Sequence, residues 1–211
     1  MRDILKLSLS LGLICGVVGV ILVAANKWTE EPRRQTTEAQ RLESMRLVLP
    51  ATVRNVSDGQ PSKVPGVTFF QAFDEQGQIV ALAAESVSLK GFGGAVKVLA
   101  GIDLQGEIQG VLVLSHGETP GIGTKVTDRK VSQSLWQVLA GKSETVAFPP
   151  NACLDSYSGK RLGETPFALN TNGIVSVSGA TFSSNAVLDA INQIGLAWRE
   201  EQDNLRQPKE K

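Results

Sequence analysis

The 211-residue chain has few of the residues that bind metals or form cross-links. It contains two cysteines, Cys15 and Cys153, and a single histidine, His116. Because Cys15 falls in a long apolar run, only Cys153 remains for the soluble part, which excludes an intradomain disulfide and an iron–sulfur cluster. One histidine and no Cys-x-x-Cys-His motif exclude a multi-histidine metal site and covalent haem. Redox chemistry here would need an organic cofactor.

The chain also lacks an excess of charge of one sign and is poor in aromatic residues. Lysine plus arginine equals aspartate plus glutamate, 21 each, so we expect no broad basic surface and no nucleic-acid partner. Aromatic residues make up 5% of the chain, whereas there are 21 glycines. This composition is typical of a β-rich domain with many tight turns.

One long apolar run stands near the N-terminus. Residues 7–25 are apolar, glycine or serine, and Lys6 is the single charged residue from Ile4 to Ala25. The run is long enough to cross a bilayer as a helix. A cleavable signal peptide is the alternative, since Val23-Ala24-Ala25 resembles a cleavage site, but the run exceeds the usual signal core. We expect a retained single-pass anchor over residues 1–25. Basic residues flank both ends, so the positive-inside rule chooses no orientation.

The rest of the chain divides into three parts. Residues 26–50 begin with a charged, proline-broken stretch and continue as a predicted stalk helix, with apolar positions at helical spacing. Residues 51–200 form the predicted soluble domain. Residues 201–211 are a charged tail that we expect to be frayed. The apolar positions of the stalk are Ala39, Leu42, Met45 and Val48.

Within the domain, two hairpins are predicted. Residues 67–73 and 78–84 flank one turn, and residues 95–102 and 107–115 flank another. Two hairpins imply an antiparallel sheet, and residues 55–65 are interpreted as a loop.

Helices are predicted beside this sheet. Helical spacing predicts a helix over residues 127–140, and residues 174–177 are interpreted as a last short strand. A C-terminal helix follows, with Ser183 or Ser184 as its expected N-cap. The fold class is therefore α+β. The apolar face of the C-terminal helix consists of Ala186, Val187, Ala190, Ile191, Ile194 and Trp198.

A cluster of hydroxyl and small residues precedes the C-terminal helix: Ser178, Gly179, Ala180, Thr181, Phe182, Ser183 and Ser184. The free N–H groups at a helix start favour an anion, so this is where we expect a phosphate to be held. The alternative interpretation is that these hydroxyls only cap the helix.

Two motifs resemble a known family. Ser178-Gly179-Ala180-Thr181 resembles the flavinylation motif of the FMN-binding domain family, Asp-x-x-Ser/Thr-Gly-Ala-Thr, although Val175 stands in the aspartate position. The block from His116 to Gly123 is similar to the family's His-x-Glu-Thr-Pro-Gly-Leu-Gly stretch. With the apolar N-terminal run, the order of segments resembles the G subunits of Rnf-type electron transport complexes.

The resemblance implies a function and a site. Thr181 would hold FMN through a phosphoester bond, made by a separate magnesium-dependent flavin transferase that uses FAD. The chain would be an electron relay with no catalytic residue of its own. It would be anchored in the bacterial inner membrane with its flavin domain on the periplasmic side. Its partners would be the other Rnf-type subunits, including the membrane subunits and the other covalent-flavin subunit.

The remaining candidate FMN-binding residues follow from the same motifs. Glu118, Thr119, Gly121 and Gly123 would line the flavin pocket, although the Pro-Gly dipeptide alone, without the resemblance, favours an ordinary turn. Phe182 is the aromatic residue best placed to stack on the ring, whereas Phe92 is expected to fill a gap in the core. His116 is interpreted as a surface or hydrogen-bonded side chain.

Two other functions remain open. One is the corresponding flavin subunit of a sodium-translocating NADH:quinone reductase. The other is a structural or assembly subunit without flavin.

Overall fold

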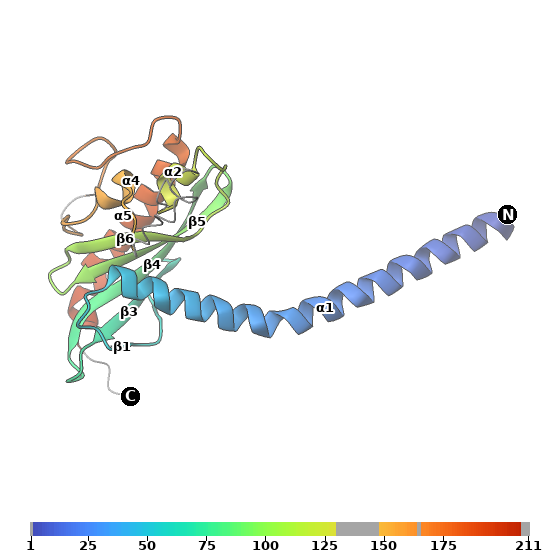
Figure 1. Ribbon diagram of the computed structural model, residues 1–211, viewed down its shortest axis with the longest axis horizontal. Coiled ribbons are helices and arrows are strands. Elements are labelled where there is room, and N and C mark those ends of the chain that lie inside the picture. The colour runs from blue at the N-terminus through green and yellow to red at the C-terminus, as the bar shows by residue number, and fades with distance from the viewer. Residues whose placement is uncertain (1, 130–147, 164–165, 208–211) are drawn as a thin grey trace, which may run out of the picture. The chain divides into compact units, whose positions relative to one another are not determined.

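The computed structural model describes residues 2–129, 148–163 and 166–207. The chain forms two compact units, one up to Leu42 and one from Glu43 onward. Helix α1 (Arg2–Val48) provides the whole first unit and ends inside the second (Figure 1).

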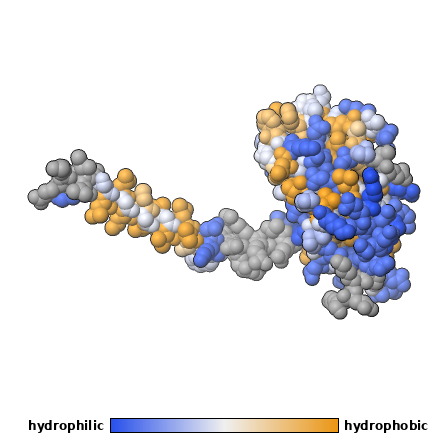
Figure 2. Space-filling view, turned by 180° about the vertical axis from the view of Figure 1, so that it is seen from behind, coloured by the Kyte–Doolittle hydropathy of each residue, from blue (hydrophilic) through white to orange (hydrophobic). Residues whose placement is uncertain are grey.

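The first unit is a helix whose apolar side chains between residues 9 and 23 are exposed, orange in Figure 2. Ser8–Trp28 is long and apolar enough to cross a membrane. The predicted proline break within residues 26–34 is wrong, since α1 continues through this stretch. A proline removes one intrahelical hydrogen bond without necessarily ending a helix. The exposed apolar residues are Leu9, Leu11, Leu13, Ile14, Val17, Val18, Val20, Ile21, Leu22 and Val23.

The second unit is built on an antiparallel sheet in the order β1-β3-β4-β5-β6, with β2 paired to β3. Its strands are β1 (Asn55–Val56), β2 (Gln60–Pro61), β3 (Val67–Phe73), β4 (Ile79–Gly91), β5 (Gly94–Asp103) and β6 (Ile108–Ser115). Its helices are α2 (Thr124–Thr127), α4 (Ala152–Asp155) and α5 (Thr181–Leu205). The α+β class is confirmed, and both predicted hairpins are present as β3–β4 and β5–β6. The predicted loop over residues 55–65 in fact includes β1 and β2.

Both faces of the sheet are buried, because successive strand residues point to opposite sides. On β3, Phe69 belongs to the cluster packed against α5, and Phe70 belongs to the cluster packed against the end of α1. On β4, Leu82 likewise belongs to the cluster packed against α5, and Ala83 belongs to the cluster packed against the end of α1. The last turn of α1 is thus part of the domain core.

Helix α5 lies on the other face of the sheet, against β3, β4 and β5. All six residues of its predicted apolar face are buried. The helix continues to Leu205, whose side chain is buried, so the predicted fraying from residue 201 is wrong as far as residue 205. Gln71 Nε2 secures this end by donating hydrogen bonds to the carbonyls of Leu205 and Gln207.

Two further expectations need comment. The helix predicted over residues 127–140 lies mostly outside the described residues; within them, Thr127 ends α2 and Asp128 is extended. The strand predicted over residues 174–177 is wrong, since that segment pairs with no strand in the described part of the chain. Side chains secure it instead, because Val175 N–H donates to Ser156 Oγ and Val177 N–H donates to Ser184 Oγ.

The close packing of α1 on the sheet can be tested at Gly101. A Cβ at this position would overlap the carbonyl oxygen of Val48. We expect Gly101→Ala to lower the free energy of unfolding by about 1–3 kcal/mol, the usual effect of overpacking a core. Gly110 is the matched control, because it pairs with Gly101 across β5–β6 and its Cβ would meet Val48 and Phe148 at 3.7 Å or more. Urea unfolding that gives the two variants equal stability would contradict this packing.

Candidate functional site

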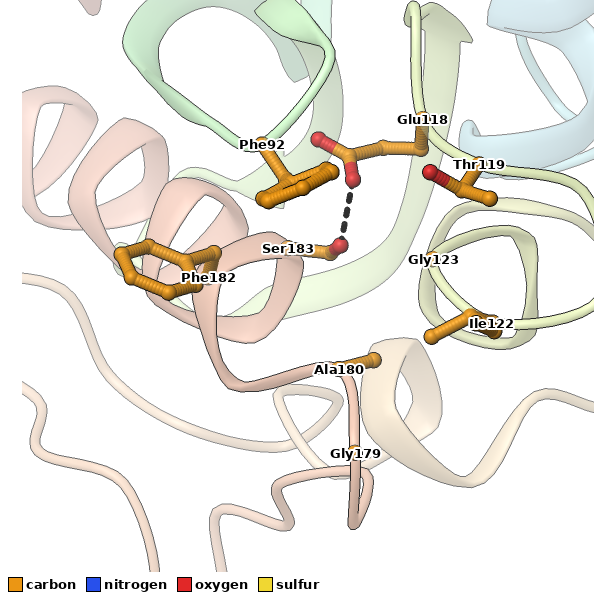
Figure 3. Close-up of a pocket in the computed structure, with 9 residues that line it drawn as sticks. All are labelled: Phe92, Glu118, Thr119, Ile122, Gly123, Gly179, Ala180, Phe182 and Ser183. Atoms are coloured by element: carbon orange, nitrogen blue, oxygen red, sulfur yellow. Dashed lines mark hydrogen bonds between the residues drawn. The ribbon is translucent and has the colours of Figure 1, made fainter.

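Three segments that are far apart in the sequence meet at one end of the sheet. They are the β4–β5 turn at residues 91–94, the loop of residues 116–123 after β6, and the start of α5 at Thr181. Figure 3 shows side chains from all three segments around one cavity. The site is therefore a product of the tertiary fold.

Two glycines allow the first two segments to touch. A Cβ at Gly93 would overlap the carbonyl of Gly117, and a Cβ at Gly117 would overlap the carbonyl oxygen of Gly93. Only glycine permits two backbones to approach this closely. The glycine turn between β4 and β5 therefore rests directly on the loop that follows β6.

Glu118 connects all three segments. Its side chain is buried, with the residue 5% exposed. Ser183 Oγ, in the first turn of α5, donates a hydrogen bond of 2.6 Å to Glu118 Oε2 (Figure 3). Gly93 N–H, in the β4–β5 turn, makes a longer contact of 3.5 Å with Oε1. One acidic side chain thus fixes the start of α5 against both loops.

His116 holds this loop in place through hydrogen bonds at both ring nitrogens. Its Nδ1 accepts the backbone N–H of Glu118 at 3.2 Å, so the ring proton is on Nε2. Nε2 lies 2.7 Å from Asp128 Oδ1 and donates to it. The prediction of a hydrogen-bonded histidine is confirmed. The imidazole positions the backbone that holds Glu118.

The rest of the loop turns tightly into α2. The carbonyl of Thr119 accepts the N–H groups of Ile122 and Gly123 at 3.3 and 3.0 Å. Gly121 has a positive φ of 78°, and its N–H donates to Thr124 Oγ1. Gly123 is buried beside the Glu118–Ser183 pair, with no room for a side chain.

Helix α5 begins at Thr181 with an uncapped N-terminus. The N-cap residue is Ala180, which offers no side-chain acceptor, and the first intrahelical bond runs from Ser184 N–H to its carbonyl. Within the described residues, the N–H groups of Thr181, Phe182 and Ser183 donate no hydrogen bond. Such groups and the helix dipole attract an anion. Thr181 itself is exposed, so its hydroxyl is accessible.

The predicted N-cap is wrong because the two serines have other roles. Both lie inside the first turn and are buried, whereas the helix begins earlier at Thr181. Ser183 bonds to Glu118, and Ser184 donates to the carbonyl of Ala180. The chain enters the helix through Gly179, whose φ is 80°.

An apolar cavity of about 210 Å³ opens beside this helix start. Phe92 and Phe182 are 71% and 63% exposed, and their ring centroids are 6.2 Å apart. The expectation that Phe92 fills a core gap is therefore wrong, since a turn tip between glycines projects away from the core. The lining residues are Phe92, Glu118, Thr119, Ile122, Gly123, Gly179, Ala180, Phe182 and Ser183.

Most, but not all, of the candidate residues line the cavity. Ser178 is exposed ahead of it, Gly121 lies in the turn outside it, and Ser184 is buried beneath it. Thr181 adjoins it, between the lining residues Ala180 and Phe182. Sequence reasoning did not select Ile122 as a lining residue, although an isoleucine next to a Pro-Gly turn is an apolar residue with no expected place in the core.

The thiol near this helix start is chemically inert. Cys153 is fully buried, and burial raises its pKa to about 11, although a hydrogen bond with Ser184 acts in the opposite direction. The thiol is protonated at neutral pH and is a poor nucleophile.

Asp189 holds α5 to β4 near the same end of the sheet. It accepts hydrogen bonds from Ser88 Oγ at 2.7 Å and from Gln193 Nε2 at 2.9 Å, and it pairs with Lys90. Burial alone would raise the pKa of Asp189, but the bonds from Lys90 and Ser88 outweigh it, so the pKa lies below its ordinary value of 3.8.

Comparison with known proteins gives this geometry a context. Residues 91–194 match the model of the family described as FMN-binding domain. The match begins at the β4–β5 turn and ends within α5, so it includes every residue that lines the cavity.

Curated relatives share a single description, the G subunit of an ion-translocating oxidoreductase complex. The protein from Shewanella loihica is 30% identical over 154 residues, which cover 69% of this chain and 71% of the relative. The protein from Stutzerimonas stutzeri is 33% identical over 165 residues, covering 74% of this chain and 67% of the relative. The protein from Vibrio vulnificus is 32% identical over 138 residues, which cover 63% of this chain and 56% of the relative.

The tight packing behind the cavity can be tested at Gly123. A Cβ there would lie 2.6 Å from Glu118 Oε2 and 2.8 Å from Ser183 Oγ. We expect Gly123→Ala to disrupt their hydrogen bond and to lower the free energy of unfolding by about 1–3 kcal/mol. Gly195→Ala is the control, because its Cβ would meet neighbours at 3.6 Å or more in the middle of α5, where alanine is favoured. Denaturant unfolding in which Gly123→Ala matches the wild type would contradict the assigned contact.

The Asp189 contacts predict a pH dependence. Because the folded pKa is lowered, the stabilisation is present above the unfolded pKa near 3.8 and is lost as the pH falls through the folded pKa. We expect Asp189→Asn to flatten the decline in stability below pH 4. Thermal unfolding between pH 2 and 6 measures this, and a variant with the same acid decline as the wild type would refute the role.

Proposed function

The chain belongs to the family of G subunits of ion-translocating oxidoreductase complexes, and we propose that it is the electron-carrier subunit of an Rnf-type complex. In this proposal FMN is joined to Thr181 by a phosphoester bond. FMN supplies reversible uptake and release of electrons when bound. The protein binds and orients this group and relays electrons between partner subunits, without catalysing a reaction alone.

The helix start fits a phosphate bonded to Thr181. Attachment needs an exposed hydroxyl, small neighbours and donors for the phosphate charge. Thr181 is exposed, and Gly179 and Ala180 precede it. No atom lies within 4 Å of a Cβ built at Gly179, which leaves space for a bulky substituent. The three N–H groups without a hydrogen bond at residues 181–183 would donate to the phosphate oxygens.

The cavity fits one part of a flat ring system. Ligand pockets usually measure about 300–1,000 Å³, so a cavity of about 210 Å³ would enclose only part of FMN and leave an edge open. Ile122, Ala180 and Phe182 would exclude water from one side, and Glu118 and Thr119 provide polar contacts. An open edge suits a carrier that must bring its cofactor close to a partner.

The rest of the proposal concerns location and maturation. The apolar segment Ser8–Trp28 would anchor the chain in the inner membrane, with the flavin domain on the periplasmic side. Its partners would be the other Rnf-type subunits. A flavin transferase would add the group from FAD: Thr181 Oγ bonds to the phosphorus of the FMN half, its proton is lost, and AMP leaves.

The observation that carries the proposal is an exposed threonine at an uncapped helix start beside an apolar cavity. We expect the full chain, co-expressed with a flavin transferase, to give a fluorescent band under ultraviolet light after denaturing electrophoresis. Thr181→Ala should abolish the band, because it removes the hydroxyl that would form the ester. The mass of the intact chain measures the same bond independently.

A second threonine provides the control. Thr171 is also exposed but lies in the loop before residue 174, outside the lining of the cavity. Thr171→Ala should keep the fluorescence. A fluorescent Thr181→Ala band would place the attachment elsewhere. An unmodified mass for the chain isolated from its native complex would favour a structural or assembly subunit.

A further inference from the structure

Glu118 is a buried acidic side chain that forms no ion pair within the described part of the chain. Each of its oxygens faces a donor, Ser183 Oγ–H for Oε2 and Gly93 N–H for Oε1. A carboxylate is the form of this side chain in which both oxygens accept such contacts. Among the ion pairs of the described residues, none involves Glu118. The structure therefore keeps one uncompensated negative charge at the wall of the cavity.

The neighbouring charged groups do not neutralise it. Lys90, from the end of β4, pairs with Asp189. His116 is held by Asp128 through Nε2 while its Nδ1 accepts an N–H, which is the neutral form of the ring. Burying a charge without a counterion is unfavourable, so this arrangement opposes stability. Such a cost is expected where the charge acts on a ligand.

We infer that the Glu118 carboxylate lowers the reduction potential of the flavin. This inference rests on the proposed function, because it requires FMN in the cavity that Glu118 lines. An electron that enters the ring brings negative charge into a site where the carboxylate is already present. The repulsion is strong because the surroundings are apolar and Glu118 is only 5% exposed, with little water to screen it. The reduced form is destabilised relative to the oxidised form.

The inference can be tested by removing the negative charge of Glu118 with little change in the shape of its side chain. We expect Glu118→Gln, loaded with flavin at Thr181, to have a more positive midpoint potential in spectroelectrochemical titration at pH 7. A tenfold change in the one-electron equilibrium corresponds to 59 mV, and we expect a shift of at least this size.

Glu75→Gln is the matched control for net charge. Glu75 is an exposed acid at the opposite end of β4, paired with Arg54. The 13-residue strand separates it from the cavity by roughly 40 Å, several times the screening length of about 8 Å at physiological salt. Its potential should equal that of the wild type.

Two further variants separate charge from hydrogen bonding. Ser183→Ala removes the donor to Glu118 and keeps the charge, so the potential should not rise. Thr119→Lys places a cation next to Glu118, on an exposed residue that lines the cavity, so the potential should rise as in Glu118→Gln. This variant keeps the test valid if Glu118→Gln does not fold.

The flavin-free proteins give an independent readout. In a Thr181→Ala background, Thr119→Lys should have a Tm no lower than that of its parent, because the added cation compensates the buried charge and leaves the Glu118–Ser183 hydrogen bond in place. A decrease of several degrees would contradict an uncompensated charge.

The outcomes distinguish this inference from the proposed function. Absence of covalent flavin in the wild type refutes the proposed function. Full flavin loading with an unchanged potential in both Glu118→Gln and Thr119→Lys refutes the role of Glu118 and leaves the proposed function intact. A rise in Ser183→Ala equal to that in Glu118→Gln would show that the hydrogen bond, and not the charge, is responsible, and would also refute the inference.

Discussion

The arrangement of the site depends on one hydrogen-bonded carboxylate. Glu118 accepts Ser183 from the first turn of α5 and contacts Gly93 in the β4–β5 turn. The residues it joins are 65 and 25 positions away in the sequence. Three backbone positions around it have no space for a side chain, since a Cβ at Gly93, Gly117 or Gly123 would clash with its neighbours. The cavity exists because these backbones meet closely on one side and leave apolar side chains on the other.

A sheet that is buried on both faces makes this junction rigid. The end of α1 covers one face and α5 covers the other, so the strands are fixed from both sides. The start of α5 is then set by the packing of the whole helix, from Ala186 to Leu205. A helix positioned in this way tolerates an uncapped N-terminus, although the absence of a capping side chain costs about 1 kcal/mol. The N–H groups that remain free are the ones available to an anion.

Sequence patterns predicted a large part of this fold. Alternating apolar residues and turn residues identified both hairpins, and helical spacing identified the buried face of α5 correctly. Errors arose where local propensity competed with packing. Ser183 and Ser184 are good capping residues, but their hydroxyls bond to Glu118 and to the carbonyl of Ala180 inside the helix. Phe92 is apolar, but it lies at the tip of the β4–β5 turn, which projects away from the core.

The sequence by itself determined the apolar N-terminal helix, the hairpins, the amphipathic C-terminal helix and the two motifs around Glu118 and Thr181. These features depend on residues close together in the chain, whose periodicity and turn chemistry are local. Only the tertiary structure decided that Glu118 meets Ser183, that Phe92 lies beside Phe182, and that the end of α1 enters the core. Such contacts join segments that become neighbours only after the sheet and α5 have packed, and no local pattern encodes that packing.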